Sequence, residues 1–163
     1  MNERHQHPKV DPTSIPARRG SSYPRRFHDV NGHIPARAWQ PIGAGLTAFG
    51  ANRVTLPPGA ASSLRHWHTK EDELVVVVAG HCVMLTDEGE TPMTVGDVAV
   101  FPMNSGNGHC FVNRTQSDAV LIVVGNNDDA DECFYPDVGM RARSQHDGGG
   151  YVDATTGLPY DDT

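Results

Sequence analysis

Three histidines and one glutamate in the sequence carry side chains that can coordinate an ion or exchange protons. One residue separates His66 from His68, and four more separate His68 from Glu73. If the first pair lies on a strand, both imidazoles face the same side, roughly 6.5 Å apart. His109 could join them from a later strand. Imidazole nitrogens with one carboxylate suit Mn, Fe, Ni, Zn or Cu and leave coordination positions open. The sequence therefore predicts one divalent transition metal held by His66, His68, Glu73 and His109.

Short strands are expected to hold these side chains in place. From about residue 46 onward, β-branched and aromatic runs are cut by Gly, Pro, Asn and Asp at intervals of about ten residues. We expect strands at residues 46–56, 63–68, 73–79, 81–86, 91–95, 98–101, 110–113 and 119–124. Apolar residues do not recur at helical spacing over three turns, so any helix is minor. This pattern predicts an all-β fold, a single jelly-roll β-barrel.

Segments of different composition flank the expected barrel. Residues 1–40 hold five of the twelve prolines and predict an extended arm without a core of its own. The barrel itself would span residues 41–135. Residues 136–163 are rich in Gly and Asp and predict a surface tail.

Two runs, 74–78 and 119–124, are apolar at every position, which is typical of strands buried on both faces. A barrel standing alone would leave one of these faces in water. The arm could cover this face, or a second copy of the chain could. We predict the second copy, and hence a homodimer.

Composition excludes several classes of partner and location. The chain has 163 residues and a net charge of -7, so it can bury one core and its field repels nucleic acid and anionic lipid. Its first residues are polar, and no apolar run is long enough for a signal peptide or a membrane span. The three cysteines form no CxxC pair, which favours a reducing compartment. We therefore expect a cytoplasmic protein.

The residues that carry the predicted site resemble the two motifs of the cupin family. The first motif is similar to Gly59, His66-Trp67-His68, Glu73 and Gly80. The second is similar to Gly96, Pro102, Gly106, His109 and Asn113. Fifteen residues, 81–95, separate the motifs, as in compact bacterial single-domain cupins. One extra residue before His66 and two between Pro102 and Gly106 depart from the pattern and lengthen turns without changing ligand types.

The stretch as a whole, including the Gly-rich segment before Tyr151, also resembles, less specifically, a group of uncharacterised bacterial cupins, some of them labelled sugar-phosphate-isomerase-like. The resemblance implies a small metalloenzyme of isomerase, lyase or dioxygenase type acting on a small polar or oxygenated substrate. The alternative is a non-catalytic module that binds or senses a small molecule. No general base can be named from the sequence.

A few further residues could contribute to the pocket. Phe111 shares the face of His109 and could line the cavity. Glu71 and Asp72 are expected to be solvated, or to support the ligands if they face the pocket. Arg53 and Arg65 could meet an anionic substrate, but Arg65 alternates with His66 and should face outward.

Overall fold

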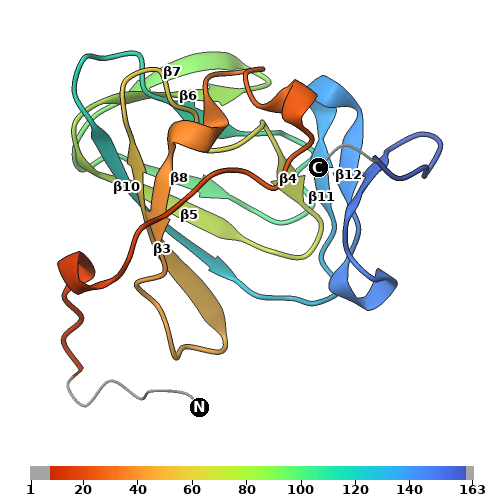
Figure 1. Ribbon diagram of the computed structural model, residues 1–163, viewed down its shortest axis with the longest axis horizontal. Helices are drawn as coiled ribbons and strands as arrows, with labels where there is room; N and C mark the ends of the chain where they lie inside the picture. Colours follow the sequence, from red (N-terminus) through yellow and green to blue (C-terminus); the bar gives the residue numbers. More distant parts are fainter. Residues whose placement is uncertain (1–7, 161–163) are drawn as a thin grey trace.

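The computed structural model describes residues 8–160, and these form an all-β fold with five short 3-10 helices and no α-helix (Figure 1). The largest sheet has the strand order β1 (Arg18–Arg19), β2 (Ala38–Gln40), β3 (Phe49–Leu56), β10 (Ala119–Asn126), β5 (Glu73–Ala79), β8 (Val98–Phe101). A three-stranded sheet has the order β7 (Gly89–Met93), β6 (Cys82–Thr86), β9 (Cys110–Val112). A four-stranded sheet has the order β13 (Tyr151–Asp153), β12 (Met140–Ala142), β11 (Cys133–Tyr135), β4 (Trp67–His68).

The 3-10 helices lie in the segments that flank or connect the sheets. They are η1 (Pro12–Ser14), η2 (Arg25–Phe27), η3 (Ile34–Ala36), η4 (Pro136–Val138) and η5 (Gln145–Asp147). Three of them have proline in the first turn, where its fixed φ suits helical backbone and its missing N–H costs nothing. None of the described helices is long and apolar enough to cross a membrane.

The predicted strands agree with the structure best in the centre of the large sheet. β5 and β8 have the predicted bounds. The other six predicted strands differ from the structure in their bounds, and two of them differ most. The strand expected at 63–68 is reduced to Trp67–His68, and the one expected at 91–95 runs from Gly89 to Met93. The second shift follows from the tight turn after Thr86, which pairs Thr86 with Gly89 and thereby sets the register of β7 on β6.

Two sheets pack face to face around one hydrophobic cluster. The large sheet contributes Val54, Leu56, Val75, Val77 and Leu121, and the three-stranded sheet contributes Cys82, Met93 and Phe111. No ladder pairs these two sheets within the described residues, and the isolated bridges, Ala61 to Val112 and His66 to His109, instead connect the segment before β4 with β9 and the residue before it. The structure therefore shows the jelly-roll layers but does not show the closed barrel that the sequence predicts.

The arm and the tail complete a second hydrophobic cluster, whose other members include Leu64 and Val112. Tyr23 and Ile34 of the arm are buried there with Tyr135 and Met140. β2 extends the large sheet through pairing of Trp39 with Val54, and β11 pairs with β4. The sequence missed β1, β2 and β11 to β13 because these strands are only two or three residues long. The domain boundaries at residues 40 and 135 stay predictions.

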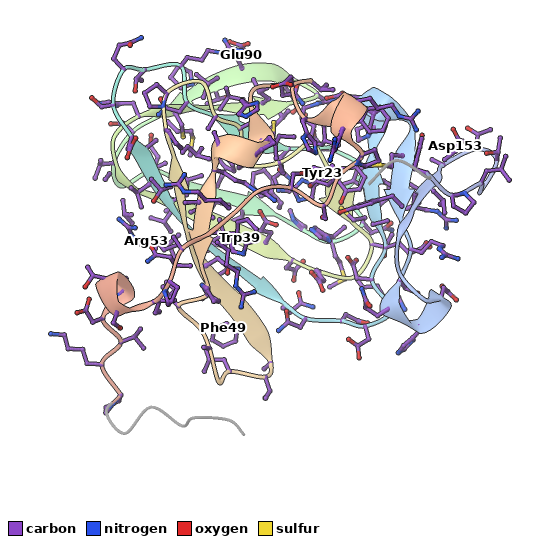
Figure 2. All side chains as sticks on the ribbon, in the orientation of Figure 1. Tyr23, Trp39, Phe49, Arg53, Glu90 and Asp153 are labelled. Atoms are coloured by element: carbon purple, nitrogen blue, oxygen red, sulfur yellow. The ribbon has the colours of Figure 1, made fainter. Side chains whose placement is uncertain are left out.

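The large sheet has one covered and one open face. Val75 and Val77 are buried, whereas Leu74 and Val78 of the same strand are 37% and 44% exposed. Val98 and Val100 on the neighbouring β8 are 55% and 64% exposed. Figure 2 shows Phe49 at the projecting end of β3, where it too is exposed. Within the single chain, β5 is therefore not buried on both faces, contrary to what its composition predicts.

Candidate metal centre

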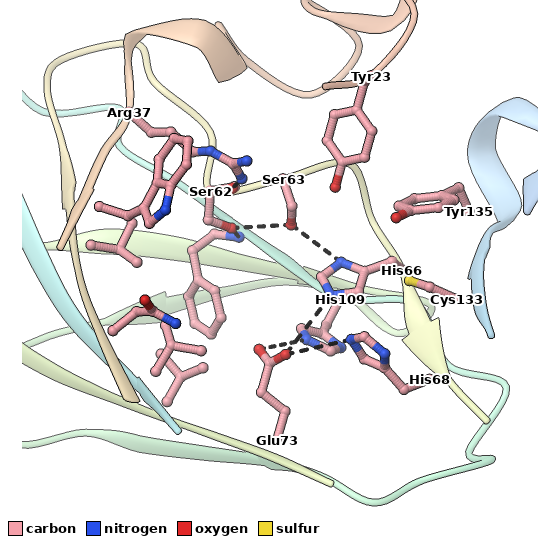
Figure 3. A pocket seen from close by; sticks show the side chains of 16 residues that line it. Tyr23, Arg37, Ser62, Ser63, His66, His68, Glu73, His109, Cys133 and Tyr135 are labelled. Carbon is pink, nitrogen blue, oxygen red and sulfur yellow. Dashed lines mark hydrogen bonds and ion pairs between the residues drawn. The ribbon is translucent and has the colours of Figure 1, made fainter. Parts of the chain in front are cut away.

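A cavity of about 320 Å³ opens between the sheets, and the predicted ligand residues lie along its wall (Figure 3). His66 and His68 come from the segment around β4, and Glu73 is the first residue of β5. His109 directly precedes β9, and its backbone exchanges hydrogen bonds with His66. Phe111 also lines the cavity.

Glu73 lies at the centre of the three histidines. Its Oε1 is 3.1 Å from His109 Nε2. Its Oε2 is 3.9 Å from His66 Nε2 and 3.8 Å from His68 Nε2. Strand alternation explains the convergence of the pair, because Trp67 points the other way and stacks on Phe134 with ring centroids 4.7 Å apart. Ligand atoms of His66, Glu73 and His109 thus lie within 4.8 Å of one another, and His68 adjoins this set through Glu73.

The hydrogen bonds of two imidazoles fix which nitrogen is free to bind a metal. His66 Nδ1 is 2.9 Å from the Leu64 carbonyl oxygen, which can only accept, so Nδ1 carries the proton. His68 Nδ1 is 2.6 Å from Asp131 Oδ2 and donates to that carboxylate. Both Nε2 lone pairs are therefore turned toward Glu73, the arrangement found in metal-bound histidines.

His109 is held by packing. The Phe101 ring stacks on its imidazole with centroids 3.5 Å apart and an interplanar angle of 4°. Its Nδ1 is buried and has no hydrogen-bond partner within residues 8–160. Burial lowers the pKa of His109 to about 4, against the opposing effect of Glu73. This imidazole is therefore neutral at physiological pH, as a metal ligand must be.

The other charges of the site also fit a cation. Burial alone would raise the pKa of Glu73, but the hydrogen bond from His109 and the nearby His66 outweigh burial and hold that pKa well below its usual range. Burial acts to lower the pKa of His66, yet Glu73 outweighs that effect and the pKa is raised. One ionised carboxylate thus attracts three imidazoles, and a divalent ion would take the place of the protons.

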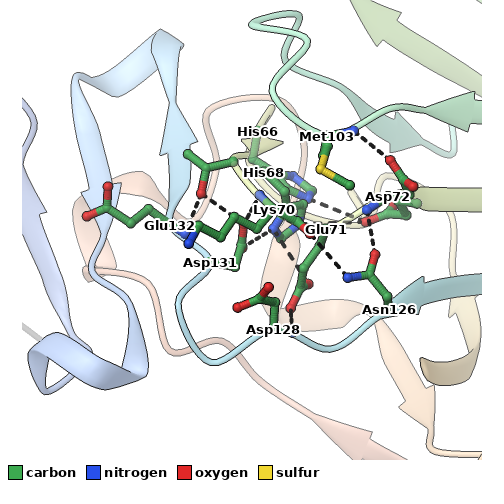
Figure 4. A network of polar contacts seen from close by, with 12 residues as sticks. His66, His68, Lys70, Glu71, Asp72, Met103, Asn126, Asp128, Asp131 and Glu132 are labelled. Atoms are coloured by element: carbon green, nitrogen blue, oxygen red, sulfur yellow. Dashed lines mark hydrogen bonds and ion pairs between the residues drawn. The ribbon is translucent and has the colours of Figure 1, made fainter. Parts of the chain in front are cut away.

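A second acidic group supports the site from outside (Figure 4). Besides His68, Asp131 accepts hydrogen bonds from the Thr69 hydroxyl and the Lys70 backbone N–H, at 3.2 and 2.7 Å. Glu71 Oε2 is 3.8 Å from His68 Nδ1, and burial raises the pKa of Glu71. Asp72 instead accepts from the backbone of Met103 at 2.8 Å.

Sequence reasoning missed several residues at the site. Asp131 lies in an acidic loop after β10 that no motif marks. Cys133 offers a sulfur near His66 and His68, and these three could also hold an ion. Tyr23 and Arg37 reach the cavity from the arm. The sequence carries no local signal for these residues, because only the pairing of short strands and turns brings them to the cavity from both ends of the chain.

The two arginines considered as anion contacts lie elsewhere. Arg65 pairs with Asp87 and Asp137, each at 2.7 Å, on the side away from the cavity. Arg53 donates to Gln40 Oε1 at 2.9 Å and does not line the cavity either.

The layered fold and the site together define a class, small jelly-roll proteins with histidine and glutamate donors in the cavity. Residues 52–125 match the model of the cupin domain. A sugar phosphate isomerase of the cupin superfamily from Silicibacter pomeroyi is 39% identical, with 96% of this chain and 99% of that chain covered at a TM-score of 0.87. The chain belongs to the cupin superfamily.

Other solved structures are more distant. A putative sugar phosphate isomerase from Acidithiobacillus ferrooxidans is 26% identical, with 74% of this chain and 78% of that chain covered at a TM-score of 0.69. A predicted oxalate decarboxylase from Thermotoga maritima is 22% identical, with 72% and 97% covered at a TM-score of 0.58, and it shows the shared fold alone. No curated protein matches the sequence.

Proposed function

We propose that this cupin is a metal-dependent enzyme of isomerase, lyase or dioxygenase type that acts on a small polar or oxygenated substrate. His66, His68, Glu73 and His109 would hold one divalent ion, Mn, Fe, Ni, Zn or Cu. The observation that carries the proposal is the approach of all three imidazole Nε2 atoms to the Glu73 carboxylate, within 3.1 to 3.9 Å. When bound, such an ion polarises substrate oxygens or lowers the pKa of bound water.

The rest of the cavity suits a small oxygenated molecule. Burial raises the pKa of Tyr23 and Tyr135, so both hydroxyls stay protonated and can donate hydrogen bonds to substrate oxygens. Phe111, Val75 and Val123 form an apolar wall that limits water. The volume of about 320 Å³ is at the small end for ligand pockets.

The similar protein from Silicibacter pomeroyi bears the name sugar phosphate isomerase and aligns over nearly the whole of both chains. That name supports isomerase chemistry as the first to assay. The metal and the reaction stay part of the proposal, because the donor set alone suits several ions and several reactions.

Metal content and turnover test the proposal together. The protein is purified without added metal, its metal content is measured, and sugars, sugar phosphates, keto acids and diols are screened. We expect about one ion per chain, and about tenfold or greater loss of metal affinity in His68→Ala. His81→Ala, which changes an exposed histidine, is the matched control. Full occupancy in His68→Ala would disprove the ligand assignment, and stoichiometric metal without turnover would favour a non-catalytic binding module.

We also propose that the open face of the large sheet forms a homodimer interface. Leu74, Val78, Val98 and Val100 are exposed aliphatic side chains on adjacent strands, and contiguous apolar patches mark association surfaces. Val100→Asp should convert a dimer to a monomer in sedimentation velocity, whereas Leu158→Asp, on the exposed tail, should not. A wild-type protein that is monomeric at high micromolar concentration would overturn this assignment.

A cytoplasmic location remains part of the proposal. All three cysteines are free and buried in the structure, which agrees with a reducing compartment.

A further inference from the structure

A guanidinium group lies at the other side of the cavity from the metal ligands. Arg37, directly after η3, lines the cavity, and Figure 3 shows its side chain across the pocket from Glu73. Its Nη1 donates to the Ser62 carbonyl oxygen, and its guanidinium carbon is 5.3 Å from the Trp39 ring centroid. Its Nε is buried and has no hydrogen-bond partner within residues 8–160.

The charge of Arg37 is not balanced by a neighbouring carboxylate. Arginine is always protonated in proteins and carries five N–H donors. Arg65, Arg114 and Arg141 each form an ion pair at 2.6 or 2.7 Å. Within the described range, Arg37 forms none. The carboxylate that lines the cavity, Glu73, is surrounded by the three histidines.

A partly buried cation without a counter-ion is costly unless a ligand supplies the missing charge. The planar guanidinium fork matches carboxylate and phosphate oxygens, and charge-assisted bonds of this kind are among the strong ones. With a metal ion on the opposite wall, both ends of the cavity would carry positive charge although the whole chain has a net charge of -7. The cavity would then favour a bifunctional anion over a neutral sugar.

We propose that Arg37 is an anion subsite that binds the carboxylate or phosphate group of the substrate while the oxygens at its other end reach the metal ligands. The part concerning the metal rests on the proposed function, and the anion subsite does not. The Asn52 amide and the Tyr23 hydroxyl line the same cavity and can complete the hydrogen bonds of such a molecule.

Calorimetric binding of three related probes tests the subsite. Glycerol, glycerate and glycerol 3-phosphate are titrated into metal-loaded and metal-free protein. We expect at least one anionic probe to bind wild type about tenfold or more tightly than glycerol, the size of one charge-assisted contact. Tighter binding of glycerate would identify a carboxylate subsite, and tighter binding of glycerol 3-phosphate would identify a phosphate subsite.

Three variants assign the effect to this side chain. R37Q should lose about tenfold or more in affinity for the anionic probe and leave glycerol binding and metal content unchanged. R37K keeps the positive charge but lacks the planar guanidinium fork, so its affinity for the anionic probe should lie between those of R37Q and wild type. R37K also tests the subsite if R37Q folds poorly. R114Q removes an exposed arginine charge and should bind as wild type does.

Two kinds of result would overturn the subsite. One is binding of the anionic probes by R37Q as tightly as by wild type, which would leave Arg37 with only the structural task of tying the arm to Ser62. The other is wild-type binding of both anions no better than glycerol. Arg37-dependent anion binding in a protein that takes up no metal would instead refute the proposed function and keep the subsite.

Discussion

The two ends of the cavity are built from different parts of the chain. The metal end is formed by two motif segments, 66–73 and 109, which are tied to each other by backbone hydrogen bonds between His66 and His109. The opposite end is formed by Arg37 and Trp39 of the arm. The first end contains most of the polar donors that suit a metal, and the second contains a cation and an aromatic ring.

Under the proposed function, this difference separates the residues that would hold the metal from those that would select the substrate. The ligand set is fixed by strand alternation and by a bridge between neighbouring segments, so any chain with the motifs would reproduce it. The arm reaches the cavity only because β2 pairs with β3 and Ile34 is fully buried. Changes in the arm could therefore alter the ligand that binds without disturbing the metal.

Removing the negative charge of Glu73 should have the largest effect on ligand affinity, because it acts directly on metal binding. Glu73→Gln deletes the one anionic donor, and we expect metal affinity to fall by more than about a hundredfold, beyond the range seen when a supporting partner is lost. A competition titration with a chelator measures it. Glu90→Gln, at an exposed glutamate paired with Arg114, is the control. If E73Q also abolished anion binding by metal-free protein, the two ends would not be independent.

The proximity of His66, His68 and Glu73 could be predicted from the sequence because its determinants are local. The residue types, the HxH alternation and the turn before Glu73 are all visible in a short stretch. His109 lies 36 residues after Glu73, beyond such a local signal, and metal binding by the four residues stays a prediction. The central strands β5 and β8 were also predicted with their bounds, because long apolar runs between turns leave few alternatives.

The arm end could not be predicted, because its determinants are long-range. Arg37 follows a proline-rich segment without periodicity, and its place in the cavity depends on pairing of β2 with β3. Asp131 is one of several acidic residues in a loop, and only pairing of β11 with β4 brings that loop to His68. Short edge strands carry too little pattern to reveal such pairings.

Because Asp131 supports His68 by a hydrogen bond, removing its negative charge should cause a smaller loss of metal affinity than Glu73→Gln does. In Asp131→Asn an amide oxygen can still accept from Lys70, but the amide nitrogen cannot accept the proton of His68 Nδ1. The tautomer with a free Nε2 is then no longer favoured, and metal affinity should fall about tenfold to a hundredfold. Asp129→Asn, in the same loop but exposed, is the control. Unchanged affinity in D131N at an unchanged melting temperature would remove Asp131 from the site.

Metal uptake should depend on pH through His66 but not through His109. The pKa of His66 is raised because Glu73 outweighs burial, so His66 must lose a proton before it can bind a metal. Burial lowers the pKa of His109 to about 4, so it contributes no proton between about pH 5 and 8.

Below the raised pKa of His66, metal affinity should therefore fall as pH falls, by up to about tenfold per pH unit for this one proton. Calorimetry in buffers of different ionisation enthalpy counts the protons released. Affinity that stays constant from about pH 8 to 5 would contradict ligation by His66.

The smallest change in ligand affinity is expected when Trp39, which faces the guanidinium of Arg37, is substituted. A cation–π contact contributes about 0.5–1 kcal/mol at an exposed site, so Trp39→Leu should weaken anion binding about two- to fivefold. Trp39→Phe keeps an aromatic face and should lose less. Neither variant should change metal affinity, because Trp39 contacts none of the four ligand residues. A loss of metal affinity in W39L equal to its loss of anion affinity would show that the arm also shapes the metal end.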